Sequence, residues 1–107
     1  GCRMCMAACP YNARVFNWSE PNREPDFKYG YDAVPERGKG VMEKCTLCKE
    51  RCDDGLEPMC VVCCPTSARV YGDLDDPESE ISKLVAENDA YNLLEGKGTR
   101  PQVYYYE

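Results

Sequence analysis

The sequence predicts an α+β fold with long loops, one C-terminal helix and an extended tail. Three features lead to this prediction: two groups of cysteines, a Pro- and Gly-rich stretch over residues 17–40, and a helical pattern after residue 76. Leu, Ile, Val and Phe together make up 17 of the 107 residues, and the net charge is −6. A chain so poor in apolar residues does not stabilise a fold through its core alone. We therefore expect its nine cysteines to supply much of the stability.

The composition also excludes several classes of function. The sequence contains no histidine, which excludes Ser-His and Cys-His catalysis and His-containing zinc sites. No residue set offers acid–base or nucleophilic chemistry, so we expect no substrate pocket. No apolar run approaches the ~18 residues of a transmembrane segment. The acidic balance argues against nucleic acid as a partner.

The cysteines form two groups that each end in Cys-Pro. The first group reads C-x2-C-x3-C-P and the second reads C-x2-C-x11-C-x3-C-P. Both match the end of the C-x2-C-x2-C-x3-C-P run of bacterial ferredoxins, in which the cysteine before proline ligates the other cluster. The spacing therefore predicts a ferredoxin-like domain that binds [4Fe–4S] clusters. The candidate ligands are Cys2, Cys5, Cys9, Cys45, Cys48, Cys60 and Cys64.

Two other uses of the cysteines fit the sequence less well. Disulfide bonding is disfavoured by the odd number of cysteines and by the adjacent pair Cys63 and Cys64. A zinc ribbon would use two C-x2-C knuckles. It would leave Cys9-Pro10 and Cys64-Pro65 without a purpose.

Short strands are expected after each Cys-Pro turn, around residues 14–17 and 69–72, as βαβ repeats of ferredoxin type require. Residues 17–40 are rich in Pro, Gly, Tyr and charge, and they predict a long connection with a short strand pair around residues 27–31. Trp18 and the tyrosines are expected to pack against the cluster loops. The alternative is that they line an electron path.

The predicted helix begins with Asp76 as the capping residue and Pro77 at its first position. Its apolar residues recur at helical spacing, and glycines at 96 and 98 end it. Residues 100–107 are expected to form an extended tail. We therefore divide the chain into a cluster-binding region over 1–75 and a helix and tail over 76–107, which pack on that region or on a partner. The apolar positions of the helix are Ile81, Leu84, Val85, Tyr91 and Leu94.

These motifs resemble the iron–sulfur subunits of the dimethyl-sulfoxide-reductase family, especially the polysulfide-reductase and tetrathionate-reductase branch. The resemblance begins with residues 1–14, which include Cys9-Pro10-Tyr11-Asn12-Ala13-Arg14. It continues through residues 43–48, 58–61, 64–68, 72–74, 76–77 and 98–105. It therefore covers nearly the whole chain.

The resemblance implies four cysteine motifs and up to four clusters in two ferredoxin-like halves. The chain would be the C-terminal half, as its start at Gly1 also suggests, and residues outside it would complete each cluster. A bare two-motif ferredoxin would instead join Cys2 and Cys5 with Cys64, and the other cysteines with Cys9. The chain would contact two to four clusters. One would be [3Fe–4S] if a ligand before Gly1 is not cysteine.

The resemblance further implies an electron-transfer subunit of a membrane-associated respiratory complex. It would relay electrons between a quinone-reactive membrane subunit and a catalytic subunit of molybdopterin or related type, on the periplasmic face rather than in the cytoplasm. The alternative is a free-standing, soluble two-cluster ferredoxin.

Two cysteines and four cations depart from the ligand pattern. Cys52 and Cys63 are expected to be small buried apolar residues, with Cys52 as an alternative ligand. The cations are expected either to raise the cluster potential or to solvate exposed loops. They are Arg3, Lys44, Lys49 and Arg51.

Overall fold

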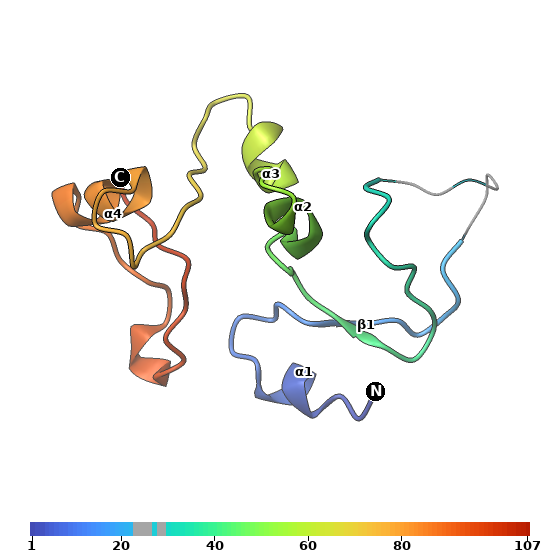
Figure 1. The fold of residues 1–107 in the computed structure, drawn as a ribbon. Coiled ribbons are helices and arrows are strands. Elements are labelled where there is room, and N and C mark those ends of the chain that lie inside the picture. The colour runs from blue at the N-terminus through green and yellow to red at the C-terminus, as the bar shows by residue number, and fades with distance from the viewer. Residues whose placement is uncertain (23–26, 28–29) are drawn as a thin grey trace. The chain divides into compact units, whose positions relative to one another are not determined.

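The computed structural model describes residues 1–22, 27 and 30–107 and consists of short elements joined by long loops (Figure 1). Its contacts divide the chain into two units, residues 1–56 and 57–107. The first unit contains α1 (Met4–Ala8), β1 (Val15–Phe16), β2 (Met42–Glu43) and α2 (Lys49–Asp53). The second contains α3 (Met59–Val62), α4 (Glu80–Glu87) and a 3₁₀ turn, η1 (Glu95–Lys97). None of the helices described is long and apolar enough to cross a membrane.

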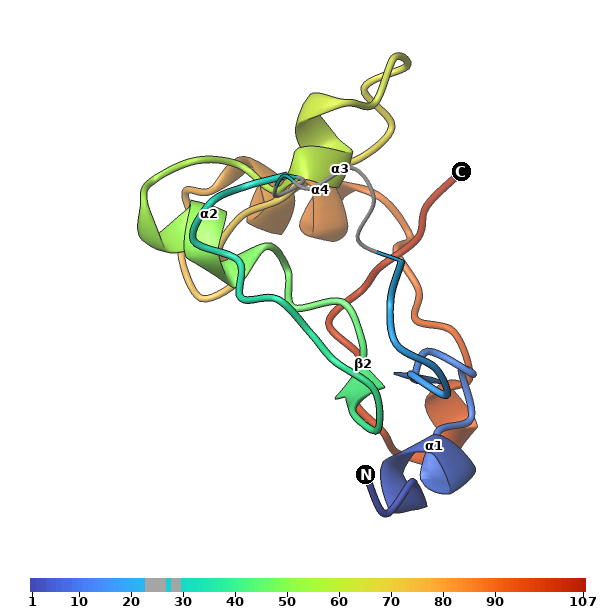
Figure 2. The ribbon, with the colours of Figure 1, turned by 90° about the vertical axis from the view of Figure 1, so that its right-hand side faces the viewer.

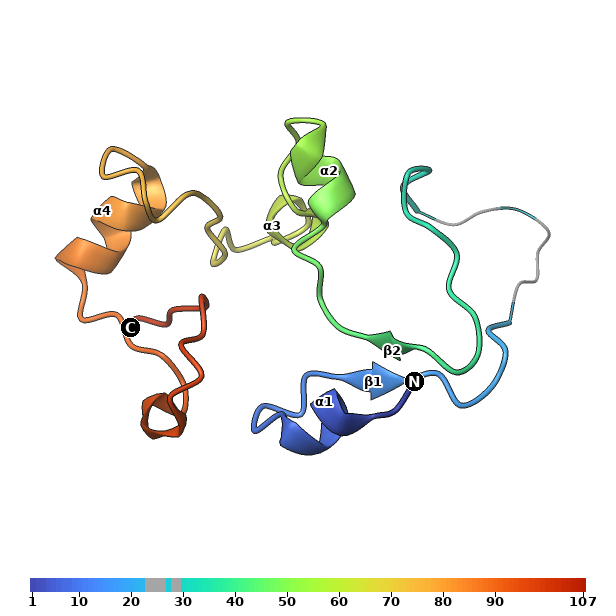
Figure 3. The same cartoon turned by 60° about the horizontal axis from the view of Figure 1, so that its bottom comes forward.

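Strands β1 and β2 form a small antiparallel sheet (Figure 3). Val15 lies opposite Glu43, and Phe16 lies opposite Met42. The Asn17 amide continues the ladder by donating to the carbonyl of residue 41 at 3.0 Å. This confirms the strand predicted at residues 14–17 and gives it a partner that the sequence analysis did not identify.

The start of the chain lies against the entry to β2. A Cβ on Gly1 would lie 2.4 Å from the carbonyl oxygen of Gly40, so the backbones meet too closely for a side chain there. Figure 2 shows the chain passing through β2 and on toward α2. The sheet thus connects the first cysteine group with the beginning of the second.

Helix α4 is shorter than the sequence pattern predicts. Its cap is Ser79, whose hydroxyl accepts from the Ser82 amide at 3.2 Å. Asp76 instead forms a turn before the helix, with its carboxylate accepting from the Glu78 amide at 2.9 Å. The predicted start at Asp76 and the predicted extension through Leu94 are therefore wrong, because the helix ends at Glu87.

Residues 69–72 do not form the second predicted strand. They run as an extended segment, and Gly72 lies so close to Ile81 of α4 that a Cβ would approach its side chain to 3.0 Å. The predicted strand pair at 27–31 falls mainly on residues 28–29 and lies outside the described residues.

The tail folds back on the segment that follows α4. Tyr91 and Tyr105 exchange two backbone hydrogen bonds of 2.9 Å in an antiparallel bridge. The Asn92 side chain donates to the carbonyls of Pro101 at 3.3 Å and Val103 at 2.7 Å. Residues 91–92 therefore hold part of the tail within its own unit.

No hydrophobic core is present among the residues that the structure describes. Pro58 is buried, but no large apolar side chain is, and Met4 is 69% and Trp18 62% exposed. The scarcity of apolar residues noted in the sequence thus has a direct structural counterpart. Burial of apolar area contributes little to the stability of the chain as described.

Candidate iron–sulfur centres

The candidate ligands lie at the ends of short helices and in the turns beside them. In the first unit, Cys5 is in α1 and Cys9 ends it, while Cys48 caps α2. In the second unit, Cys60 is in α3 and Cys64 follows its end. Cys2 and Cys45 are exposed in the segments that precede α1 and α2.

All nine cysteines are free thiols. Over residues 1–22, 27 and 30–107, no three Cys, Asp or Glu side chains gather as a metal site. The structure therefore does not bring together three of the predicted ligands. Their ligation of clusters stays a prediction from spacing and local geometry.

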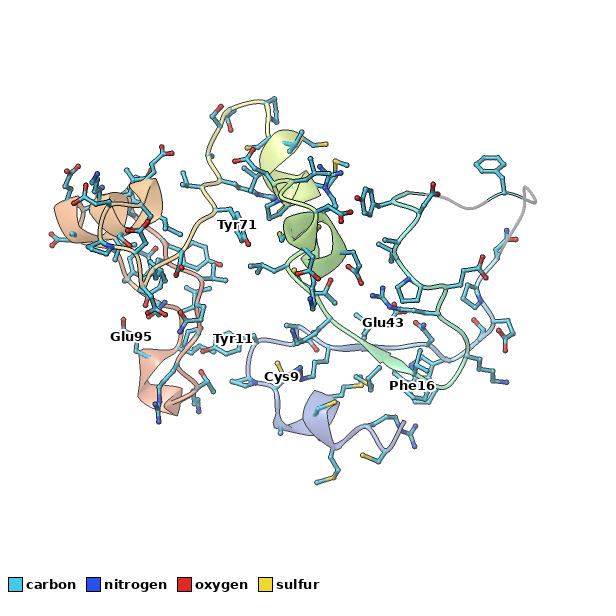
Figure 4. All side chains as sticks on the ribbon, in the orientation of Figure 1. Cys9, Tyr11, Phe16, Glu43, Tyr71 and Glu95 are labelled. Atoms are coloured by element: carbon cyan, nitrogen blue, oxygen red, sulfur yellow. The ribbon has the colours of Figure 1, made fainter. Side chains whose placement is uncertain are left out.

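The loop after α1 surrounds the Cys9 sulfur with donors (Figure 4). The amides of Ala13 and Tyr11 lower the pKa of the Cys9 thiol. The charge of Arg14 and the amide of Asn12 add smaller contributions in the same direction, and partial burial opposes them. The loop therefore stabilises a thiolate, the form of cysteine that binds metal.

The loop after α3 repeats this arrangement around Cys64. The Thr66 hydroxyl, 3.6 Å from the sulfur, contributes most to lowering the pKa of the Cys64 thiol. The Ala68 amide donates to the same sulfur at 3.3 Å and also lowers it, as do the Thr66 amide and the Arg69 charge, whereas partial burial raises it.

A shared backbone turn produces both loops. Asn12 and Ser67 each have φ of +52°, three residues after their Cys-Pro cysteine. A left-handed residue reverses the chain locally, which lets the next amide point back toward the sulfur. The sequence analysis did not single out these residues. The available signal was the repeat C-P-x-x-A-R, which occurs at residues 9–14 and 64–69.

The C-x2-C turn before α2 also directs an amide at sulfur. The Leu47 amide donates to the Cys45 sulfur at 3.4 Å. Leu47 and Cys48 have φ of +59° and +50°, two consecutive left-handed residues without glycine. Such conformations carry a steric cost and recur at functional sites, so they support a ligand role for this turn.

Cys52 and Cys63 are not buried as predicted. Cys52 is half-buried and its thiol donates to the Leu47 carbonyl at 3.2 Å, whereas Cys63 is exposed and lies 3.3 Å from the Met59 sulfur. The prediction is wrong because the described chain has no apolar interior in which to place them.

The cations beside the ligands contact neighbouring groups of the protein. Arg3 stacks over Trp18 and Phe16, with its guanidinium carbon 5.0 and 5.3 Å from the ring centroids. The two rings meet edge-on with centroids 4.7 Å apart, which supports packing as the role of Trp18.

The remaining three cations have different partners. Lys44 donates to the Cys45 carbonyl at 2.8 Å, Lys49 pairs with Asp53, and Arg51 lies 5.6 Å from the Tyr31 ring centroid.

These local features fit a [4Fe–4S] cluster. The donors are soft thiols without histidine, several sulfurs already receive amide hydrogen bonds, and the ligand turns are largely exposed. Thiolates and hydrogen bonds to sulfur are the two means by which proteins hold and tune such clusters.

Comparison with known proteins gives an independent line of evidence. Residues 29–74 match the family described as "4Fe-4S dicluster domain". The chain is 59% identical over 105 residues to the iron–sulfur subunit of a putative dimethyl sulfoxide reductase of Halobacterium salinarum. The match covers 98% of this chain and 39% of the relative.

More distant relatives agree. The chain is 39% identical over 134 residues to the iron–sulfur subunit of a Shewanella arsenate respiratory reductase, covering 98% of this chain and 57% of that protein. It is 37% identical over 105 residues to one of the chains of the polysulfide reductase of Wolinella succinogenes, covering 97% and 45% respectively. The chain thus spans between 39% and 57% of the length of these three relatives.

Both comparisons confirm the resemblance and the cofactor class inferred from the cysteine spacing. The chain therefore belongs to the 4Fe–4S dicluster proteins, in the group that contains the iron–sulfur subunits of dimethyl sulfoxide, selenate, arsenate and polysulfide reductases.

Proposed function

We propose that this chain is the electron-relay part of an iron–sulfur subunit in a membrane-associated respiratory reductase complex. The observation that carries the proposal is the repeated Cys-Pro loop, in which amide and hydroxyl donors converge on the sulfurs of Cys9 and Cys64. Such loops suit a thiolate bound to a cluster. The clusters, when bound, supply one-electron redox chemistry, and the protein sets their spacing and surroundings.

The proposed ligands keep the two roles that the motifs assign. The closely spaced cysteines hold one cluster for each group, and each cysteine before proline reaches toward another. The first role belongs to Cys2 and Cys5 in one group and to Cys45, Cys48 and Cys60 in the other. The second role belongs to Cys9 and Cys64.

The partners follow from the names of the relatives. They include the iron–sulfur subunits of an Hdr-like menaquinol oxidoreductase and of a menaquinone reductase, as well as components of arsenate and polysulfide reductases. We therefore assign one quinone-reactive membrane partner and one catalytic partner of molybdopterin or related type. The periplasmic face is the proposed location. The helix and tail over residues 76–107 pack on the cluster-binding region or on one of these partners.

A free-standing two-cluster ferredoxin is the second candidate. It would use the same seven cysteines but no partner subunit. The relatives argue against it, because those named above are called subunits or chains of larger enzymes.

The test is the iron content and electron paramagnetic resonance of the native complex purified without oxygen. Replacing Cys48 by alanine should abolish the signal of one cluster and leave the others, since a thiolate ligand is lost. Cys63→Ala is the matched control, because Cys63 is another cysteine of the same group with no ligand role in the proposal. Unchanged iron and spectra in Cys48→Ala would refute the ligand assignment. Purification of a loaded chain without any partner would favour the ferredoxin.

A further inference from the structure

Two arginines make the same long-range hydrogen bond in the two halves of the chain. Arg14 Nε donates to the Cys5 carbonyl oxygen at 3.1 Å, and a terminal guanidinium nitrogen of Arg69 donates to the Cys60 carbonyl oxygen at 3.5 Å. Each arginine follows its Cys-Pro cysteine by five residues and returns to the cysteine nine residues before itself. Neither arginine was singled out as a functional residue from the sequence.

We infer that Arg14 and Arg69 are paired positioning residues that hold the two C-x3-C-P turns closed and place a positive charge beside the clusters. The inference rests on the proposed ligation of those clusters by Cys5, Cys9, Cys60 and Cys64. It assigns the arginines a task in setting cluster retention and potential. They do not themselves bind iron.

The carbonyls that receive these bonds lie where a short helix leaves its acceptors unpaired. Cys5 lies in the five-residue helix α1, whose last four carbonyls lack partners within the helix. In α3, the amides of Cys63 and Cys64 donate to the carbonyls of Met59 and Val61, on either side of Cys60. The Cys60 carbonyl receives Arg69 instead.

Each bond therefore spans one complete ligand step. It joins the residue after the Cys-Pro loop to the preceding ligand cysteine, and so fixes the path of the cysteine in between. The two thiols of the step must point toward different clusters, which requires a fixed turn between them. A bond across the ends of that turn is well placed to maintain it.

The charge of each arginine acts on the same step. Arg14 and Arg69 already act on the sulfurs of Cys9 and Cys64, as described above. Reduction adds an electron to a cluster that thiolates make negative, so a nearby guanidinium favours the reduced form. Arginine suits both tasks because its charge is permanent and its planar donors fit a carbonyl in one orientation.

The experiment uses the native complex and separates the bond from the charge. Arg14→Gln removes the charge, and Arg14→Lys keeps the charge but loses the planar Nε donor. The measurements are iron release to a chelator and the midpoint potentials from redox-titrated electron paramagnetic resonance. Arg69 receives the same two substitutions. Arg37→Gln and Arg100→Gln are the matched controls, one in each unit.

Arg14→Gln should weaken iron retention by about tenfold, at the lower end of what loss of a supporting partner costs at metal sites. It should also lower the potential of one cluster. Arg14→Lys should release iron faster but keep the potential near that of the unaltered protein. The Arg69 variants should show the same pattern with smaller retention effects, since the Arg69 bond is longer.

Three outcomes would overturn the inference. One is normal iron retention and potential in both glutamine variants with clusters present. Another is an equal change in the control variants, which would make the effect one of general surface charge. A fall in potential in Arg14→Lys as large as in Arg14→Gln would refute the role of charge. By contrast, an unaltered complex without iron at this chain would refute the proposed ligation itself.

Discussion

Cys9 and Cys64 are the residues at which local structure says most about chemistry. Their loops are built from different side chains, yet both lower the thiol pKa through donors on the following four residues. At Cys9 the main cause is the Ala13 amide, and at Cys64 it is the Thr66 hydroxyl. The loops therefore favour a thiolate before any iron is bound.

This preference has a consequence for pH. Because the pKa of the Cys9 thiol is lower in the folded loop, ionisation stabilises the loop above the ordinary thiol pKa. That stabilisation is lost as pH falls through the folded-state value. After iron is removed, Cys9 should therefore react with iodoacetamide at lower pH than cysteine in a short peptide of residues 8–15. Mass spectrometry of the alkylated peptides over a pH series measures this difference, and identical pH profiles would contradict it.

Cys52 tests whether proximity to the motif is enough to make a ligand. Its thiol donates to the Leu47 carbonyl at 3.2 Å, so it supports the turn that carries Cys48. Cys52→Ala should therefore keep the full iron content of the native protein, while Cys52→Val checks that a larger apolar side chain is also accepted. Iron analysis and the cluster spectra decide the question. Loss of one cluster in both variants would show that Cys52 is a ligand.

At the scale of elements, α4 shows how a capping residue is chosen. Asp76 and Ser79 are both good capping types and lie three residues apart. Ser79 caps because its hydroxyl accepts from the Ser82 amide and also donates to the Asp73 carbonyl at 2.6 Å. The second bond depends on how residues 73–79 fold back, which no local pattern contains.

The cap makes a direct prediction for the native protein. Ser79→Ala should destabilise α4 by about 1 kcal/mol, the usual cost of losing a capping hydroxyl. Hydrogen exchange of the α4 amides measures this as faster local opening. Asp76→Ala is the matched control and should change these amides less, because Asp76 accepts from the Glu78 amide outside the helix. The opposite order of effects would restore Asp76 as the cap.

The two predicted strands illustrate what sequence can and cannot supply. The strand at 14–17 forms because Met42 and Glu43 lie across from it, although 25 residues separate Asn17 from Glu43 in the chain. Residues 69–72 have the same position after a Cys-Pro turn but pack against Ile81 of α4. A short strand needs a partner, and its identity is a tertiary property. The cysteine motifs were easier to predict, because the family's cluster chemistry fixes their spacing in the sequence itself.

At the scale of the whole molecule, the absence of buried apolar side chains in the described residues has to be compensated. Ordering a residue costs about 1–2 kcal/mol of backbone entropy, and little apolar burial offsets this here. The backbone hydrogen bonds within each unit are mostly local turns. Two sources remain: the binding energy of the clusters and contact with a partner subunit.

Removing iron distinguishes these sources. Cluster binding requires the folded ligand turns, so its free energy is also folding free energy. When a chelator removes iron from the native complex under reducing conditions, the amides of α1, α2 and α3 should lose most of their protection from hydrogen exchange. Each of these helices carries or adjoins ligand cysteines. Helix α4 carries none, so it should lose less protection and serves as the internal control. Restoring iron and sulfide should return the protection. If α1 to α3 stay protected without iron, contact with partner subunits must hold the chain together, and the clusters would be passengers in a fold stabilised from outside.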